Sequence, residues 1–150
     1  MLDIGHVFSD AQSIVLNATT GYSTNLVDFG ALVTDRGVAL NQYGPESHKM
    51  MLHVSVAVAP TAGTGIQCEL VDCATEGGTY KPTGIGLNDA IPNATLVAGY
   101  SMLKVALPAT LMRFLKILYT TTGDHTTSAG TVNARLEYGS QSDDVTPYRA

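Results

Sequence analysis

Hydrophobic and polar side chains alternate along much of this chain. In residues 50–58 every second residue is a large apolar one, and small or polar residues occupy most of the positions between them. The same period of two recurs in residues 66–71, 102–107, 115–119 and 132–138. Because successive side chains of a strand point to opposite sides of a sheet, this pattern predicts β-strands that are buried on one face.

Weaker alternation adds candidate strands at residues 13–17, 25–29 and 94–98. About eight short strands separated by loops rich in Gly, Pro, Asn and Thr are typical of an all-β sandwich, and the jelly roll is the common eight-stranded form. Residues 109–118 also fit a helix, because Leu111, Leu115 and Leu118 follow helical spacing. Short apolar runs are ambiguous in this way.

The length favours one domain. The chain has 150 residues and shows neither an internal repeat nor a linker, so we expect residues 1–150 to form a single β-sandwich. Residues 1–12 precede the clear strands and are a candidate N-terminal arm. The segment from Cys73 to Ile91 is rich in Gly and Pro, and its length suggests an interaction loop.

The chain carries few charges. Charged residues make up 14% of it, against about 25% in an average soluble domain, and the net charge is −5. The eight Lys and Arg residues are dispersed, which argues against nucleic-acid binding, a property that usually depends on clustered cations. The chain also lacks an 18-residue apolar stretch and a basic amphipathic helix, so no membrane association is expected.

The first residues contain neither a basic segment nor an apolar segment of the kind found in signal peptides. We therefore expect synthesis in a cytosol, with Cys68 and Cys73 as reduced thiols.

The sequence contains few signs of a catalytic or metal-binding site. The four histidines, His6, His48, His53 and His125, lack the spacing of a metal site, although folding could still bring ligands together. The Cys68 and Cys73 pair has no second pair to complete a zinc site, and no Gly-x-Ser-x-Gly nucleophile motif is present. The sequence therefore predicts no enzyme, no catalytic residue, no bound metal and no cofactor.

Three spaced elements near the N-terminus resemble a known family. They are Phe8-Ser9-Asp10-Ala11-Gln12, Ser23-Thr24-Asn25 and Val27-Asp28-Phe29-Gly30. Their order is similar to the opening of the capsid cement, or decoration, proteins of tailed bacteriophages, including the one of a Bordetella phage. Phe29 stands where that family tends to have Leu, and residues 35–37 match its next segment only loosely.

The resemblance implies a jelly-roll protein of the virion that performs no catalysis. Such a protein would bind the outer surface of an HK97-type shell, contact its major capsid protein and stabilise the particle by bridging capsomers. Symmetric shells favour oligomeric cement proteins, and we expect a homo-oligomer, a dimer rather than a trimer.

The N-terminal element supplies the candidate contact residues for the capsid or for a second subunit, namely Phe8, Ser9, Asp10 and Gln12. An apolar ring beside polar groups could anchor on the shell or extend a sheet edge. In the alternative interpretation, Phe8 belongs to the core and Asp10 accepts hydrogen bonds in a turn.

Two other functions remain open at this point. A carbohydrate-binding sandwich of a phage tail or lectin-like protein would need exposed aromatic rings, for which Tyr22, Tyr43, Tyr80 and Tyr100 are candidates. An enzyme of the cupin type would need a cluster of histidines inside the sandwich. For the cement protein, the low charge content predicts contact surfaces richer in Thr, Ala and Tyr than in Lys or Glu.

Overall fold

The computed structural model describes residues 7–28, 50–107 and 111–138. These residues form ten β-strands and no helix, so the described part of the chain has no helix that could cross a membrane. The strands are β1 (Val7–Ser13), β2 (Thr20–Tyr22), β3 (Val27–Asp28), β4 (Met50–Val58), β5 (Gly65–Cys73), β6 (Lys81–Gly86), β7 (Ile91–Pro92), β8 (Ser101–Ala106), β9 (Phe114–Thr122) and β10 (Thr131–Tyr138).

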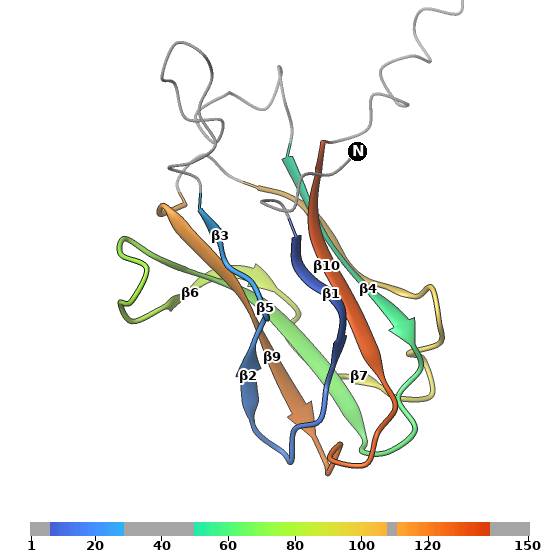
Figure 1. Ribbon diagram of the computed structural model, residues 1–150. Coiled ribbons are helices and arrows are strands. Elements are labelled where there is room, and N and C mark those ends of the chain that lie inside the picture. Colours follow the sequence, from blue (N-terminus) through green and yellow to red (C-terminus); the bar gives the residue numbers. More distant parts are fainter. Residues whose placement is uncertain (1–6, 29–49, 108–110, 139–150) are drawn as a thin grey trace, which may run out of the picture.

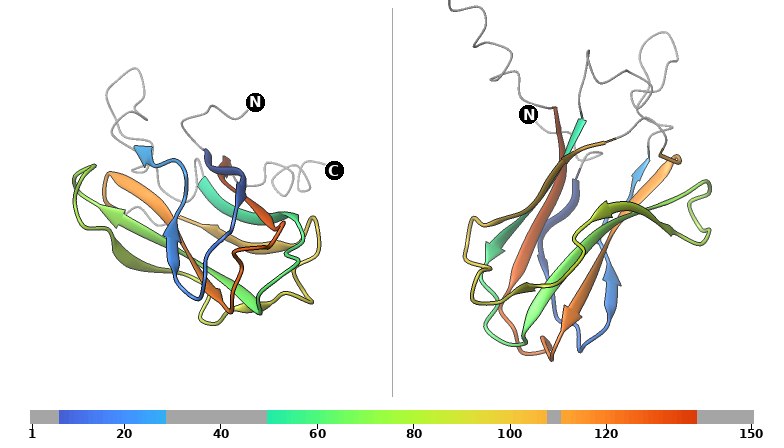
Figure 2. Two further views of the ribbon diagram at one scale, coloured as in Figure 1. Left: turned by 60° about the horizontal axis from the view of Figure 1, so that its bottom comes forward. Right: turned by 180° about the vertical axis from the view of Figure 1, so that it is seen from behind.

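The strands form two antiparallel sheets that face each other (Figures 1 and 2). One sheet has the order β1-β10-β4-β8, and the other has the order β2-β9-β5-β6. In the second sheet, β3 also pairs with β9, and β7 also pairs with β5. In this second sheet, β2 and β3 together form one interrupted edge strand, and β6 and β7 together form the other. Each of the two sheets therefore has four strand positions.

This order is that of a jelly roll. With the interrupted strands merged, the first of eight strands pairs with the eighth, the second with the seventh, the third with the sixth and the fourth with the fifth. A long hairpin rolled into two four-stranded sheets has this connectivity. The predicted fold class, an all-β sandwich of the jelly-roll type, is thereby confirmed.

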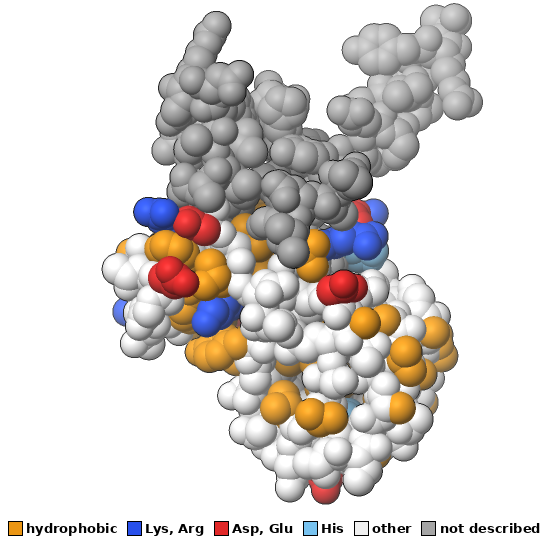
Figure 3. Space-filling model, in the orientation of Figure 1, with side chains coloured by type: hydrophobic (Ala, Val, Ile, Leu, Met, Phe, Trp, Pro, Cys, Tyr) orange, Lys and Arg blue, Asp and Glu red, His pale blue; other side chains and the backbone are white. Residues whose placement is uncertain are grey.

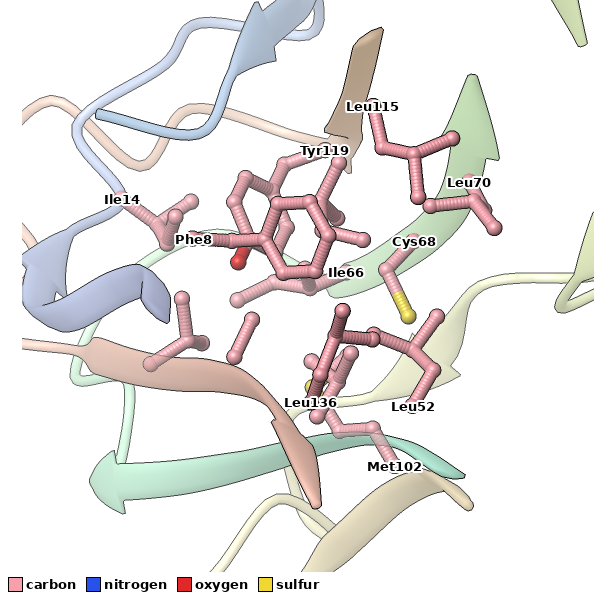
Figure 4. Close-up of a cluster of buried hydrophobic side chains, with 14 of the residues drawn as sticks. Phe8, Ile14, Leu52, Ile66, Cys68, Leu70, Met102, Leu115, Tyr119 and Leu136 are labelled. Carbon is pink, nitrogen blue, oxygen red and sulfur yellow. The ribbon is translucent and has the colours of Figure 1, made fainter. Parts of the chain in front are cut away.

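The core lies between the sheets and consists of the apolar residues that the alternation placed on one face. From one sheet come residues such as Leu52, Val54 and Leu136, and from the other come Ile66, Leu70 and Ile117, all at most 1% exposed. Figure 4 shows side chains from both sheets meeting around Phe8 and Tyr119. Burying a large apolar side chain contributes about 1.5–3 kcal/mol, so this interface holds the sheets together.

The predicted strands at 50–58, 66–71, 102–107, 115–119 and 132–138 correspond to β4, β5, β8, β9 and β10. The predicted strand at residues 13–17 is misplaced, because β1 runs from Val7 to Ser13 and shares only Ser13 with it. Two register shifts on β10 break the alternation of β1, and consecutive residues Phe8 and Ser9 are both buried. A period of two could not have located such a bulged strand.

Two further expectations are wrong. Residues 94–98 form a turn segment rather than a strand, held by short-range hydrogen bonds such as Leu96 N–H to Asn93 O. The region from Cys73 to Ile91 is not one long loop, because it contains edge strand β6. The helical alternative for residues 109–118 also fails, since Phe114 begins β9, and residues 108–110 lie outside the described part.

Candidate interaction surface

The residues predicted to contact a partner lie in β1, and most of them serve the fold. The Phe8 side chain is fully buried in the core, and Ser9 is 2% exposed with its Oγ 2.9 Å from the Tyr119 hydroxyl. Residues 7–12 of the predicted arm are thus part of the sandwich, and residues 1–6 lie outside the described part. Only Asp10 of the four presents an exposed side chain, so the core interpretation of Phe8 is correct.

The Gln12 side chain links the two sheets through hydrogen bonds. Its side-chain amide donates to Tyr22 O at 3.0 Å, and its Oε1 accepts from Thr24 N–H at 2.8 Å and from the Ser9 hydroxyl at 2.6 Å. In addition, Asn25 N–H donates to the carbonyl of Phe8 at 2.9 Å. The first two elements of the N-terminal motif therefore meet in space and join β1 to β2.

The loops at one end of the sandwich form a different kind of surface. We call this surface the uncharged end and define it by residues 14–19, 59–64, 93–100 and 123–130 together with Val58, the last residue of β4. Each loop lies within a longer run of sequence without Lys, Arg, Asp or Glu, with Asp124 as the one exception; the runs are residues 11–27, 54–68, 90–103 and 117–134. Apart from Asp124, the charged side chains of the described residues therefore lie on the rest of the sandwich.

The uncharged end also exposes apolar side chains. Val15, Val58 and Val97 are 50%, 48% and 57% exposed, and only two other large apolar residues in the described part, Tyr22 and Met112, are comparably exposed. Val15 and Val97 lie in the loops, and Val58 is the last residue of β4. Figure 3 shows the lower part of the visible surface as white and orange, with red only at its lowest point.

A buried histidine fixes two of these loops against each other. The His125 ring is completely buried and packs on Gly63, where an added Cβ would lie 2.1 Å from ring atoms Cδ2 and Nε2. His125 Nε2 lies 3.2 Å from Thr122 O, and the backbone N–H of His125 donates to Leu16 O at 2.9 Å. Asn93 approaches the same turn and donates through Nδ2 to the carbonyl of Gly63 at 2.9 Å.

Hydroxyl groups make further links. The Ser128 hydroxyl accepts a hydrogen bond from Thr61 N–H at 3.0 Å, and Thr61 Oγ1 accepts one from Ala129 N–H at 2.9 Å. The Asp124 carboxylate accepts bonds from the Thr126 hydroxyl at 2.6 Å and from its N–H at 2.9 Å, and these bonds lower the pKa of Asp124. The loops are therefore held in place before any partner arrives.

Such a surface suits contact with another protein. Threonine, alanine and valine lose less side-chain entropy on burial than lysine or glutamate, and a hydroxyl is less costly to remove from water than a charge. Charged residues are correspondingly depleted in the centres of protein interfaces. Loops that are already ordered also reduce the entropy lost on binding.

On the outer face of the β2-β9-β5-β6 sheet, aromatic and basic side chains pack against one another. Tyr22 and Tyr80 approach each other from opposite edges of the sheet, with ring centroids 6.0 Å apart. The Lys116 ammonium lies 5.2 Å from the Tyr22 ring centre and 4.6 Å from that of Tyr80. This arrangement occupies ring surface on which a sugar would stack. Of the other tyrosines named for sugar binding, Tyr100 is half-buried and Tyr43 lies outside the described residues.

The outer face of the other sheet carries a charged network. Arg135 Nε donates to Glu137 Oε1 at 2.7 Å, and His53 Nδ1 lies 3.2 Å from the same oxygen. His53 Nε2 is 3.1 Å from the Ser101 hydroxyl. Partial burial raises the pKa of Glu137, but the hydrogen bonds and charges of Arg135 and His53 lower it further, so the net effect is a lowered pKa.

The histidines do not form a cluster in the described part of the chain. His53 lies on β4 and His125 in the loop between β9 and β10, while His6 and His48 fall outside the described residues. Among the residues that are described, no three His, Cys, Asp or Glu side chains gather in a way that could hold a metal ion.

The overall composition shows the low charge content of the chain but not where on the surface the uncharged residues gather. The signal was present in the four long runs that contain no charged residue except Asp124, each of which spans a loop and parts of the flanking strands. In a jelly roll, alternate connections lie at the same end of the sandwich, so runs of this length at such connections indicate one continuous surface.

Comparison with known proteins adds the family. A protein-family model, Bbp16, which takes its name from a Bordetella phage protein, matches residues 8–136. The match extends from the beginning of β1 almost to the end of β10. A search of curated proteins finds no match.

Proposed function

The chain belongs to the Bbp16 family of phage origin, and from this membership we propose that it is a non-enzymatic structural protein of the virion. In this role it binds the outer surface of a phage capsid with an HK97-type shell. It contacts the major capsid protein, bridges neighbouring capsomers and acts as a homo-oligomer, a dimer rather than a trimer.

The uncharged end is the observation that carries this proposal. It combines three exposed valines and many hydroxyl groups with a single carboxylate, on loops joined by hydrogen bonds. We assign it as the surface that docks on the shell. The assignment replaces Phe8, Ser9 and Gln12 as the predicted contacts, because their side chains are engaged within the sandwich.

A protein that binds only the assembled shell stabilises it by mass action. The stabilisation grows with the ratio of its free concentration to its dissociation constant, and reaches about 2.7 kcal/mol per site when that ratio is 100. Bridging adds to this effect, since separating two capsomers then requires the loss of a cement contact as well.

The first experiment asks whether the chain is part of the particle. Virions of a phage that encodes it are purified, washed free of unbound protein and analysed by mass spectrometry. We expect the chain in stoichiometric amounts. If washed virions contain none of it, the proposed function is wrong.

The second experiment tests the docking surface with a matched pair of variants. Val97→Lys places a charge on the uncharged end, whereas Met112→Lys places one next to the beginning of β9, at the opposite end of the sandwich. The two parent side chains are 57% and 47% exposed, so neither change disturbs the core.

Binding is measured by co-sedimentation with shells assembled without this chain. We expect Val97→Lys to weaken binding at least tenfold and Met112→Lys to leave it within about twofold of the parent chain. Equal effects of the two variants, or a larger effect of Met112→Lys, would exclude the uncharged end as the docking surface.

A further inference from the structure

The four edge strands of the sandwich differ in whether they can accept another strand. An exposed edge offers unpaired N–H and C=O groups, and proteins usually obstruct such edges. Edges β1 and β2 lie on the same side of the sandwich and block each other, because Gln12 on β1 engages Tyr22 O and Thr24 N–H. Strand β1 is also bulged at two places, and β2 has only three residues.

The edge formed by β6 is obstructed as well. It contains Pro82, which has no N–H to donate, and Gly84 interrupts its side-chain pattern. Its register on β5 shifts between Glu69 and Val71. Proline and irregular register are common protections of sheet edges.

The β8 edge is the least obstructed of the four. Its six residues contain neither Pro nor Gly, and its one register shift on β4 lies at its beginning, between Ser101 and Leu103, so that Leu103 to Ala106 pair regularly. Half-buried Leu103, Val105 and Leu107 pack against the core and leave part of their surface uncovered at the sheet edge. The one charge, Lys104, pairs with His53 on the outer face and does not obstruct this inner apolar row.

We propose that β8 pairs antiparallel with β8 of a second copy of this chain, which joins the two β1-β10-β4-β8 sheets into one continuous sheet. This inference rests on the homodimer of the proposed function and names its interface. An antiparallel pair of identical strands has twofold symmetry by construction, as a closed dimer requires.

The side chains favour one register. Residues directly opposite each other in a sheet lie on the same face, so Lys104 can face Lys104, Met102 or Ala106 of the partner subunit. The first arrangement sets two like charges against each other, and the second requires Met102, which lies at the register shift of β8 and is buried in the core. The register with Lys104 opposite Ala106 avoids both problems and sets Val105 against its symmetry mate and Leu103 against Leu107.

Two substitutions at one exposed residue test this register. Ala106→Lys would place like charges opposite each other twice per dimer, and Ala106→Glu would place opposite charges there. Ala74→Lys serves as the control, because Ala74 is an exposed residue in the loop between β5 and β6, in the other sheet.

The measurement is the dimer dissociation constant, obtained by sedimentation equilibrium on the full chain. We expect the parent chain to form a dimer of twice its 15.7 kDa mass. Ala106→Lys should raise the dissociation constant about fivefold, Ala106→Glu should lower it about fivefold, and Ala74→Lys should leave it unchanged.

A parent chain that is monomeric overturns the proposal, as do shifts of the two Ala106 variants in the same direction or no shift in either. Circular dichroism of each variant checks that the fold is retained. Binding of the Ala106→Lys chain to empty shells separates this inference from the proposed function. If the variant dimerises more weakly but still binds shells, the β8 interface is supported and shell binding stands. If a chain that still dimerises fails to bind shells, the proposed function is wrong and the β8 interface stands.

Discussion

Replacing Gly63 by alanine should destabilise the protein strongly, because the backbone of Gly63 lies directly against the buried His125 ring. Gly63 has a φ of +83°, and an added Cβ would lie 2.1 Å from Cδ2 and Nε2 of that ring and 2.6 Å from Cε1. Contacts this short do not occur between real atoms, so the ring would have to move by about 1 Å or more.

The magnitude follows from three contributions. A left-handed backbone conformation costs an L-residue with a side chain about 1–2 kcal/mol. Forcing the His125 ring out of a fully buried position costs about 1–3 kcal/mol in overpacking, and losing its 3.2 Å bond to Thr122 O costs about 1 kcal/mol more. Gly63→Ala should therefore lower the free energy of unfolding by roughly 3–6 kcal/mol, a large part of the stability of an ordinary domain.

Urea unfolding, followed by far-ultraviolet circular dichroism, measures this loss as a change in midpoint at constant slope. Gly99→Ala is the matched control, because Gly99 has a φ of +86° but nothing within 4 Å of its added Cβ. It should lose only the backbone contribution of about 1–2 kcal/mol. If Gly63→Ala and Gly99→Ala are equally destabilising, the inferred contact between Gly63 and the histidine ring is wrong.

Three other predictions follow from contacts within the sandwich. Gln12→Ala should lower the free energy of unfolding by about 1–3 kcal/mol in the same assay, since it leaves hydrogen-bonding groups of β1 and β2 without partners. A carboxyl whose pKa falls on folding stabilises the fold at neutral pH and loses this contribution as the pH drops through its folded pKa. The pKa of Glu137 is lowered in this way, so Glu137→Gln should make the free energy of unfolding depend less on pH in the acid range. An unchanged dependence of that free energy on pH would contradict the assigned network with Arg135 and His53. Burial raises the pKa of Cys68 to about 12, so this thiol should react with a thiol reagent at neutral pH only as fast as the protein opens, and rapid labelling of the native chain would show that the core is not closed.

The regular strands could be predicted from sequence because one face of each is buried. In β4, the alternation of large apolar residues with smaller or polar ones matches the buried and less buried positions from Met51 to Ala57, and the predicted bounds are those observed; Val58, on the apolar face of the pattern, is exposed at the end of the strand. The irregular edge strands could not be predicted in this way. Pro82 and Gly84 gave β6 the composition of a loop, and the bulges of β1 concealed a strand with Phe8 in the core.

The candidate site was only partly accessible from sequence. Low charge content indicated an interface, but its location depended on which loops share an end of the sandwich, and that is a property of the topology. The N-terminal motif lies within the residues that the family model matches, and its elements contact each other through bonds such as Asn25 N–H to Phe8 O, which belong to the fold. Such residues identify a relative without being the residues that touch its partner.

The confinement of charge to one part of the sandwich has a consequence for the approach to a partner. With a net charge of −5 and only Asp124 at the uncharged end, electrostatic attraction would contribute little to an encounter at that end. The rate of association should then depend weakly on ionic strength, because few charges close to the contact are screened. A protein attached in this way would remain on its particle when the salt concentration of the surroundings changes, as it does when a phage leaves a lysed cell and is diluted into another medium.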